Sequence, residues 1–344
     1  MKNIMNMDYE ELKREITEVL GWERYRTDQI LDWIYDKKIT EFEKMTNLSK
    51  KQREILSQNY TIDFPELIDK KVSKIDGTTK FLWKLKDENT IESVLLFHPN
   101  RITACISTQV GCPVKCVFCA TGMSGFKRNL SAGEIVSQIL AMEKETGKKV
   151  GNVVYMGMGE PFLNYDEVVK SIRMLNHPKM KNIGIRRITV STVGIPEKIL
   201  KFADENLDVT LAFSLHAPSN FKRDKLVPLN RKYSIEEILH ALKIYQIKTG
   251  RRITVEYIMI KEVNDYPSDA EKLADILKDL KVFVNLIPIN PVNRIFKRPS
   301  RERLLMFKRI LNKKGIEAEI RVEKGIDIEA ACGQLRMRKL GLRT

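Results

Sequence analysis

Four of the five cysteines in this chain lie in one short stretch, CISTQVGCPVKCVFCATG, which begins at Cys105. Three of them, Cys112, Cys116 and Cys119, follow the spacing C-x3-C-x2-C, and Cys105 stands seven residues upstream of the first. Soft thiolates at such close spacing converge readily on one metal centre. Chance rarely produces this spacing, so the stretch predicts a metal site or a redox site.

Two kinds of metal centre fit these residues. A structural zinc ion needs four ligands, and the fourth would come from Cys105, from the distant Cys332 or from His98. An iron–sulfur cluster held by only three thiolates leaves one iron open, and that iron can bind a substrate or a cofactor directly. The residue types and their spacing leave both centres open.

The overall charge of the chain is strongly basic. Lysine and arginine number 60 against 45 aspartate and glutamate residues, which gives a net charge of +15. Such an excess favours a polyanionic partner, and nucleic acid is the usual one. The N-terminal sequence MKNIMNMDYEELKREI carries charges throughout and does not resemble a signal peptide. No apolar run approaches the length of a membrane span, so we expect a cytoplasmic protein with reduced thiols.

The elements that must position the cysteines form a repeating pattern. Residues 8–58 predict a basic helical module, and residues 67–97 alternate like strands. From residue 101 onward, six strand–helix units follow one another, and such units require a parallel sheet. Because six is fewer than the eight of a closed barrel, we predict an α/β fold with a partial (β/α)6 barrel. The predicted divisions are 1–62 (N-terminal helical module), 63–100 (β linker region), 101–330 (barrel) and 331–344 (C-terminal segment).

Polar residues and glycines fall where the predicted parallel strands end. In parallel α/β folds the chemistry gathers at the C-terminal ends of the strands. Taken singly, each of these residues fits an ordinary strand end, but together they predict contact with a ligand. They are Gly157, Gly159 and Glu160 in MGMGEP, Ser191 in ITVS, Ser214, Leu215 and His216 in LAFSLH, and Asn290 in LIPIN. His216 would otherwise be a metal ligand or a base.

The cysteine spacing, with Phe118 just before the third cysteine, resembles the radical S-adenosylmethionine (SAM) superfamily. The resemblance implies that Cys112, Cys116 and Cys119 hold a [4Fe–4S] cluster whose open iron chelates SAM. It also implies reductive cleavage of SAM to a 5′-deoxyadenosyl radical. The residues implied to contact SAM are Gly159, Glu160, Ser191, Ser214, Leu215, His216 and Asn290.

Within that superfamily, nearly the whole chain resembles the RlmN-type 23S rRNA adenine methyltransferases. The motifs that carry this resemblance are STQVGC, FCATG, GFKRNL, GMGEP, STVGIP, SLHAP, NLIPIN and DIEAACGQL. The resemblance implies that Cys332 is methylated by one SAM and that a radical from a second SAM removes hydrogen from this methyl group. The resulting carbon adds to carbon-2 of an adenine, and Cys105 releases the adduct through a transient disulfide with Cys332. Glu92 matches the position of the proton acceptor.

The same resemblance implies the partners. They are 23S rRNA before full ribosome assembly, some tRNAs at the adenine 3′ of the anticodon, and a low-potential electron donor such as flavodoxin or ferredoxin. We expect a monomer with no membrane partner. Two alternatives stay open: a Cfr-type enzyme that methylates carbon-8, and a non-catalytic RNA-binding protein with a structural metal site. Basic pairs such as Lys127–Arg128, Arg186–Arg187 and Lys222–Arg223 predict contacts with RNA phosphates.

Overall fold

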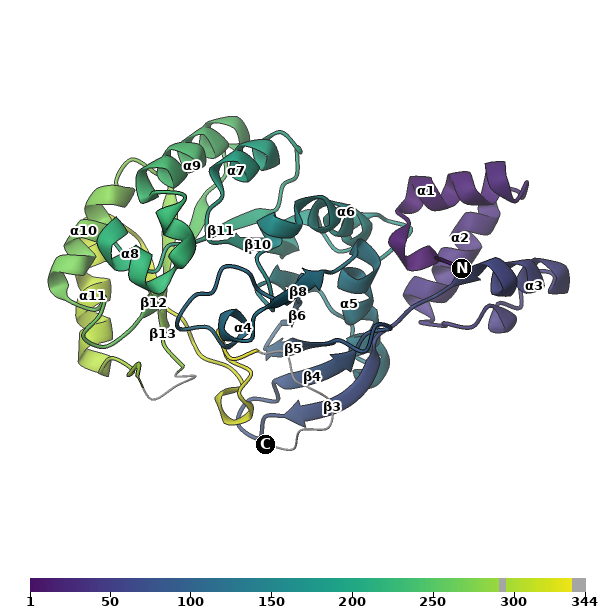
Figure 1. The fold of residues 1–344 in the computed structure, drawn as a ribbon, viewed down its shortest axis with the longest axis horizontal. Helices are drawn as coiled ribbons and strands as arrows, with labels where there is room; N and C mark the ends of the chain where they lie inside the picture. Colours follow the sequence, from purple (N-terminus) through teal and green to yellow (C-terminus); the bar gives the residue numbers. More distant parts are fainter. Residues whose placement is uncertain (291–294, 336–344) are drawn as a thin grey trace.

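The computed structural model describes residues 1–290 and 295–335 of the chain. Its main body is built on one ten-stranded sheet in the order β14-β13-β12-β11-β10-β9-β6-β5-β4-β3 (Figure 1). Neighbouring strands from β6 to β14 are parallel, as the strand–helix rhythm predicts. These strands are β6 (Arg101–Cys105), β9 (Asn152–Tyr155), β10 (Ile188–Thr192), β11 (Thr210–Ser214), β12 (Ile253–Met259), β13 (Val282–Pro288) and β14 (Ala318–Ile320).

Helices connect these parallel strands and cover the outer face of the curved sheet (Figure 1). The first of them begins at the predicted capping box, in which the Ser131 side chain and Glu134 satisfy each other's backbone N–H groups. Its apolar residues Ile135, Ile139 and Leu140 are fully buried against the body. The helices are α5 (Ala132–Thr146), α6 (Tyr165–Asn176), α7 (Pro196–Ala203), α8 (Asn220–Leu226), α9 (Ile235–Thr249), α10 (Pro267–Leu277) and α11 (Arg301–Lys313).

The predicted β linker region continues the main sheet. It consists of β3 (Glu66–Val72), β4 (Thr79–Lys84) and β5 (Thr90–His98), and all three run antiparallel to their neighbours. Because β5 pairs with β6 in opposite directions, Val94 lies beside Cys105 and His98 lies beside Arg101. His98 is therefore at the edge of the barrel opposite Cys105, which argues against His98 as a fourth ligand of the cysteine loop.

The N-terminal module packs beside the barrel, at the right of Figure 1. It contains α1 (Tyr9–Arg14), α2 (Tyr25–Leu31) and α3 (Lys50–Asn59), with β1 (Lys2–Asn3) paired in parallel to β2 (Tyr60–Thr61). Its Tyr9 ring stacks on His177 of the body with centroids 4.3 Å apart. Lys38 of the module forms an ion pair with buried Glu143 at 3.2 Å. The divisions between the predicted domains stay predictions.

The C-terminal segment crosses the open side of the curved sheet. After β14 it runs back past α4 (Ala120–Met123) towards β3 and β4, as the yellow trace in Figure 1 shows. The Gly325 N–H donates to the Asp76 carboxylate and the Lys74 N–H donates to the Asp327 carboxylate, each at 3.0 Å. These bonds hold the two edges of the sheet together through this segment. In the described part of the chain, no helix is long and apolar enough to cross a membrane.

Candidate active site

The cysteine loop follows β6 at the C-terminal edge of the parallel strands. It contains the short pair β7 (Gln109–Gly111) and β8 (Phe126–Asn129), with α4 between them. Gly111 has a φ of +78°, and a Cβ atom there would lie 1.9 Å from the Gly125 carbonyl oxygen. Only glycine fits this approach of the two backbones, and the approach closes the loop at its base.

Three thiols of this loop lie within electrostatic reach of one another. The pKa of Cys112 is raised to about 12, mainly by burial and also by the neighbouring charges of Glu160 and Cys119. The pKa of buried Cys116 is also raised, first by burial and then by the charges of the other two cysteines. A bound cation would reverse this and stabilise the thiolates. In residues 1–290 and 295–335, no three such side chains are arranged around a single ion. Three thiols from one loop are the donor set that an iron–sulfur cluster with one open iron takes.

Arg223 is a buried cation at the cysteine loop, and sequence reasoning missed its role. Its Nε donates to the Leu215 carbonyl at 2.9 Å, and one terminal nitrogen donates to Asn230 at 2.8 Å. The other terminal nitrogen donates to the carbonyl of Val193. Burial lowers the pKa of Arg223 to about 10, and its charge lowers that of the nearby Cys116 thiol.

The pair Lys222–Arg223 is therefore not an RNA contact, and that expectation is wrong. Arg223 is 1% exposed. Lys222 forms an ion pair with the buried carboxylate of Asp269 at 2.7 Å. In the sequence, this pair is two basic residues shortly after the motif SLHAP. That pattern does not show whether the side chains are exposed to solvent or whether one is a buried cation that connects the ends of two strands.

Glu160 ends the loop after β9, and its carboxylate is buried. One oxygen accepts from the Phe162 N–H at 3.0 Å and from the Thr192 hydroxyl at 2.6 Å. The other oxygen accepts from the Val193 N–H at 2.9 Å. Burial raises the pKa of Glu160, and these hydrogen bonds partly oppose the rise. The structure thus joins the end of β9 to the end of β10 through one carboxylate.

The two predicted serines lie side by side at the ends of adjacent strands. The hydroxyl oxygens of Ser191 and Ser214 are 3.1 Å apart, so the structure brings this pair together. Gly159 has a φ of +105°, and a Cβ there would lie 2.7 Å from atoms of Thr108 and Gln109. Gly159 therefore lets the chain pack against its own loop. Its contact with a ligand stays a prediction.

His216 follows β11 and packs against the cysteine loop. It has a φ of +62°, and its ring meets the Phe118 ring edge-on with centroids 5.0 Å apart. Its Nδ1 accepts from the Ile258 N–H at 3.1 Å. Burial lowers the pKa of His216 to about 3, so the ring is neutral and Nε2 carries its proton. Next to it, the Leu215 carbonyl accepts from Arg223.

A cavity of about 590 Å³ lies inside the curved sheet. Cys105, Cys119 and Cys332 all line it, and Asn290 lines it as well. The Ala120 N–H donates to the Gly333 carbonyl at 2.7 Å, which seats the Cys332 segment on the cysteine loop. The structure therefore brings Cys332 to the same cavity as Cys105 and Cys119, from which the sequence separates it widely.

Arg321 is a partly buried cation that interacts with both thiols of this pair. Burial raises the pKa of Cys105 to about 12, and the neighbouring Cys332 raises it as well. Arg321 acts in the opposite direction and lowers the pKa of Cys105. It also forms an ion pair with Glu256 at 3.9 Å, and the Glu256 carboxylate accepts a hydrogen bond from the Asn285 side chain at 2.9 Å. A cation thus faces the place where both thiols meet.

Glu92 is buried on β5. Its carboxylate lies 3.8 Å from the ammonium of Lys80 on β4, and both side chains are under 5% exposed. Lys80 also donates to the Glu329 carbonyl at 2.8 Å. Glu92 is two residues from Val94, whose strand partner is Cys105, so both point to the same face of the sheet. Lys80 thus connects Glu92 to the segment that carries Cys332, a link the sequence did not reveal.

Replacing Lys80 by methionine should loosen this segment. The change removes the ammonium that lies 3.8 Å from the buried Glu92 carboxylate and the hydrogen bond to the Glu329 carbonyl, which together cost about 3 kcal/mol of the free energy of unfolding. Backbone amides of residues 325–335 should exchange with solvent faster, as measured by hydrogen–deuterium exchange. The control is Lys84→Met on the same strand, where the ion pair with Glu66 is exposed. Equal exchange in the two variants would contradict the link.

Known proteins are similar to this chain in sequence and in fold. The radical SAM superfamily profile matches residues 106–280, and the ribosomal RNA large subunit methyltransferase N-terminal domain profile matches residues 2–62. A probable dual-specificity RNA methyltransferase RlmN of Thermotoga maritima is 70% identical over 344 residues, which is 100% of both chains. Its counterpart in Thermosipho melanesiensis is 65% identical over 99% of this chain and 100% of its own length.

A solved structure agrees over almost the full length. A radical SAM methyltransferase from Sphaerobacter thermophilus superposes with a TM-score of 0.93 at 44% identity, over 98% of this chain and 99% of that one. This match confirms the predicted α/β architecture with its N-terminal module. Superfamily membership also implies a [4Fe–4S] cluster and SAM as cofactors, in agreement with the three-thiolate loop. The chain therefore belongs to the radical SAM superfamily and, within it, to the family of RlmN dual-specificity RNA methyltransferases.

Proposed function

We propose that this chain methylates carbon-2 of a specific adenine in 23S rRNA, and of the adenine 3′ of the anticodon in some tRNAs. The family's dual-specificity RNA methyltransferases support an RNA substrate. The observation that carries the proposal is that Cys105 and Cys332 line one cavity beside the cluster loop. An aromatic C–H is too weakly acidic and carbon-2 too electron-poor for direct methyl transfer, so a carrier thiol and a resolving thiol are needed.

The cofactors would occupy the C-terminal ends of the strands. Cys112, Cys116 and Cys119 would hold the cluster. With one bound SAM, the cluster would supply an electron for SAM cleavage and a 5′-deoxyadenosyl radical, and would take an electron back later. A second SAM per turnover would supply the methyl group. The SAM contacts would be Gly159, Glu160, Ser191, Ser214, Leu215, His216 and Asn290.

Glu160 has room for one more partner. An ionised carboxylate offers about four acceptor positions. Three protein groups already donate to it, namely the Phe162 and Val193 N–H groups and the Thr192 hydroxyl. The remaining position suits the amino group of SAM. Because burial raises the pKa of this carboxyl, a cationic amino group would also stabilise its charged form.

The thiols and Glu92 would perform the transfer itself. The Cys332 sulfur exchanges its proton for a methyl group, and this methyl carbon later bonds to carbon-2 after losing one hydrogen. The hydrogen on carbon-2 leaves as a proton to Glu92. The Cys105 thiolate then attacks the Cys332 sulfur, so an S–S bond forms while the bond from sulfur to the new carbon breaks. That carbon takes a proton and becomes the methyl group. An external dithiol returns two electrons to the disulfide.

The partners and setting follow from the same proposal. The rRNA would be bound before full ribosome assembly, when the adenine is accessible. A low-potential donor such as flavodoxin or ferredoxin would reduce the cluster. The enzyme would act as a monomer in the cytoplasm.

The site of methylation can be read directly. RNA incubated with anaerobically reconstituted enzyme, SAM and reductant should contain 2-methyladenosine, identified by mass spectrometry of nucleosides against authentic standards. One methylated base should accompany one 5′-deoxyadenosine and one S-adenosylhomocysteine, because two SAM molecules are used. A product with 8-methyladenosine would instead indicate the Cfr-type reaction. Absence of any methylated adenosine with an intact cluster would refute the proposal.

A further inference from the structure

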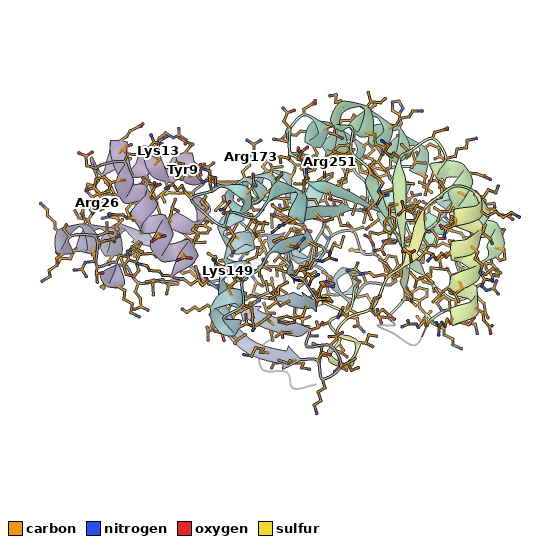
Figure 2. The ribbon with its side chains drawn as sticks, turned by 180° about the vertical axis from the view of Figure 1, so that it is seen from behind. Tyr9, Lys13, Arg26, Lys149, Arg173 and Arg251 are labelled. Atoms are coloured by element: carbon orange, nitrogen blue, oxygen red, sulfur yellow. The ribbon has the colours of Figure 1, made fainter. Side chains whose placement is uncertain are left out.

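Five basic side chains gather at the edge of the barrel opposite the cysteine loop. They come from the β5–β6 hairpin, the connection between α5 and β9, and the start of β10. We name them the basic rim: His98, Arg101, Lys148, Lys149 and Arg187. They line a hollow of about 1040 Å³, and the other residues around this hollow include no carboxylate. Figure 2 shows Lys149 on the main body, seen from behind.

In the part of the chain that the structure describes, the charges of the basic rim have no carboxylate partner. In residues 1–290 and 295–335, none of the five forms an ion pair with a carboxylate within 4 Å. Two other basic residues labelled on the same view are paired with carboxylates: Arg173 with Glu205 at 2.7 Å and Arg251 with Asp208 at 3.6 Å (Figure 2). The lysine and arginine side chains of the rim carry its positive charge, and such a group of cations around a hollow attracts polyanions.

The local field at the rim is also positive. The pKa of His98 is lowered, first by burial and then by the charges of Arg101, Lys324 and Arg321. These three cations lie on different segments, at the start of β6 and after β14. Positive charge therefore extends from the exposed rim into the barrel.

The hollow adjoins the catalytic cavity. His98, Arg101, Asn152 and Arg187 line both of them. Arg101 and Cys105 are the first and last residues of β6 and point to the same face, so about 13 Å of strand separates the rim from the thiol pair. Enzymes that modify a base take it out of the stack, so the base can enter the cavity while its phosphate stays at the surface.

We propose that the basic rim binds the phosphodiester backbone of the substrate RNA, so that the target adenine enters the barrel from the edge opposite the cluster. The proposal rests on the proposed function, because it takes RNA as the substrate. Cluster and SAM would occupy the C-terminal ends of the strands, and the Cys332 segment covers the open side there. The rim is the end of the cavity left for a polyanion. Phosphate contacts of this kind fix the position of an RNA without reading its sequence.

The test compares two triple variants that remove equal charge from the full-length, cluster-reconstituted protein. The rim variant is Lys148→Gln/Lys149→Gln/Arg187→Gln, and all three side chains are exposed. The control variant is Arg173→Gln/Lys201→Gln/Lys248→Gln, whose side chains pair with Glu205, Asp166 and Asp204. Binding of an in vitro transcribed tRNA and of a 23S rRNA fragment is measured by fluorescence anisotropy at several salt concentrations. Thermal unfolding checks that each variant folds.

The rim variant should lose on the order of ten- to a hundred-fold in RNA affinity, and its slope of log affinity against log salt should fall by about 2. The control variant should change the slope by less than 1. Equal losses in both variants would mean that only net charge matters and would overturn the proposal, as would an unchanged rim variant. These outcomes are separate from the failure of the proposed function, which would show as wild-type protein that binds RNA but forms no methylated adenosine.

Discussion

Cys332→Ala should abolish RNA methylation completely, because the variant has no sulfur to carry the methyl group. The protein should contain no S-methylcysteine after incubation with SAM, as read by peptide mass spectrometry of the segment around residue 332. The cluster should still form, since its three predicted ligands lie in the loop from Cys112 to Cys119. Iron content and the visible absorption of the reconstituted protein serve as the control.

The location of Cys332 makes this result specific. Its neighbour Gly333 accepts a hydrogen bond from Ala120, and Thr121 donates to the Leu335 carbonyl at 2.5 Å. These backbone bonds do not involve the Cys332 side chain, so the alanine variant should keep the segment seated. Methylated RNA from Cys332→Ala would show that SAM transfers its methyl group without this thiol.

Cys105→Ala should trap RNA covalently on the protein. In this variant Cys332 is still methylated and still forms its bond to carbon-2, but no thiol remains to attack the Cys332 sulfur. We expect methylated product to fall by at least about a hundred-fold, and a protein–RNA species to appear on denaturing gels. Nuclease digestion followed by mass spectrometry should locate the adenosine on Cys332.

The environment of Cys105 adds a pH dependence in the wild-type protein. Burial raises the pKa of Cys105 to about 12, so the thiol form dominates near neutral pH. Because the thiolate is the nucleophile, release of the adduct should speed up about ten-fold per pH unit between roughly pH 6 and pH 9. Arg321 favours the thiolate form of Cys105, so it limits how small the thiolate fraction becomes at neutral pH. Normal turnover by Cys105→Ala, or release that does not depend on pH, would contradict the resolving role.

Local sequence patterns were sufficient for the architecture. Alternating strand and helix signals between residues 101 and 313 predicted the parallel sheet, because helical and strand periodicities are properties of short windows. The C-x3-C-x2-C spacing likewise predicted three thiols around one centre, since the ligands come from one loop. The capping box at Ser131 and Glu134 is local in the same way, and it starts α5 at the predicted residue.

Contacts between distant segments were decided only by the tertiary structure. The placement of Cys332 beside Cys105 depends on how residues 321–335 cross the open side of the sheet, and no short window contains that path. The sequence suggested the pair only through resemblance to a family. The contacts of Lys80 and Arg223 with carbonyl groups could be identified only from the structure. From sequence alone, a lysine or an arginine is expected to be exposed to solvent.

The five cysteines therefore form two groups, which differ in whether local or long-range contacts determine their positions. One group lies within a single loop and consists of Cys112, Cys116 and Cys119. Their spacing in the sequence is enough to predict that these thiols lie close together. The other group is the pair Cys105 and Cys332. Their positions depend on long-range contacts, namely the pairing of β5 with β6 and the segment that crosses the open side of the barrel. Sequence determines which residues can do chemistry within a loop, whereas the packing of the sheet edges decides which distant residues meet in the cavity.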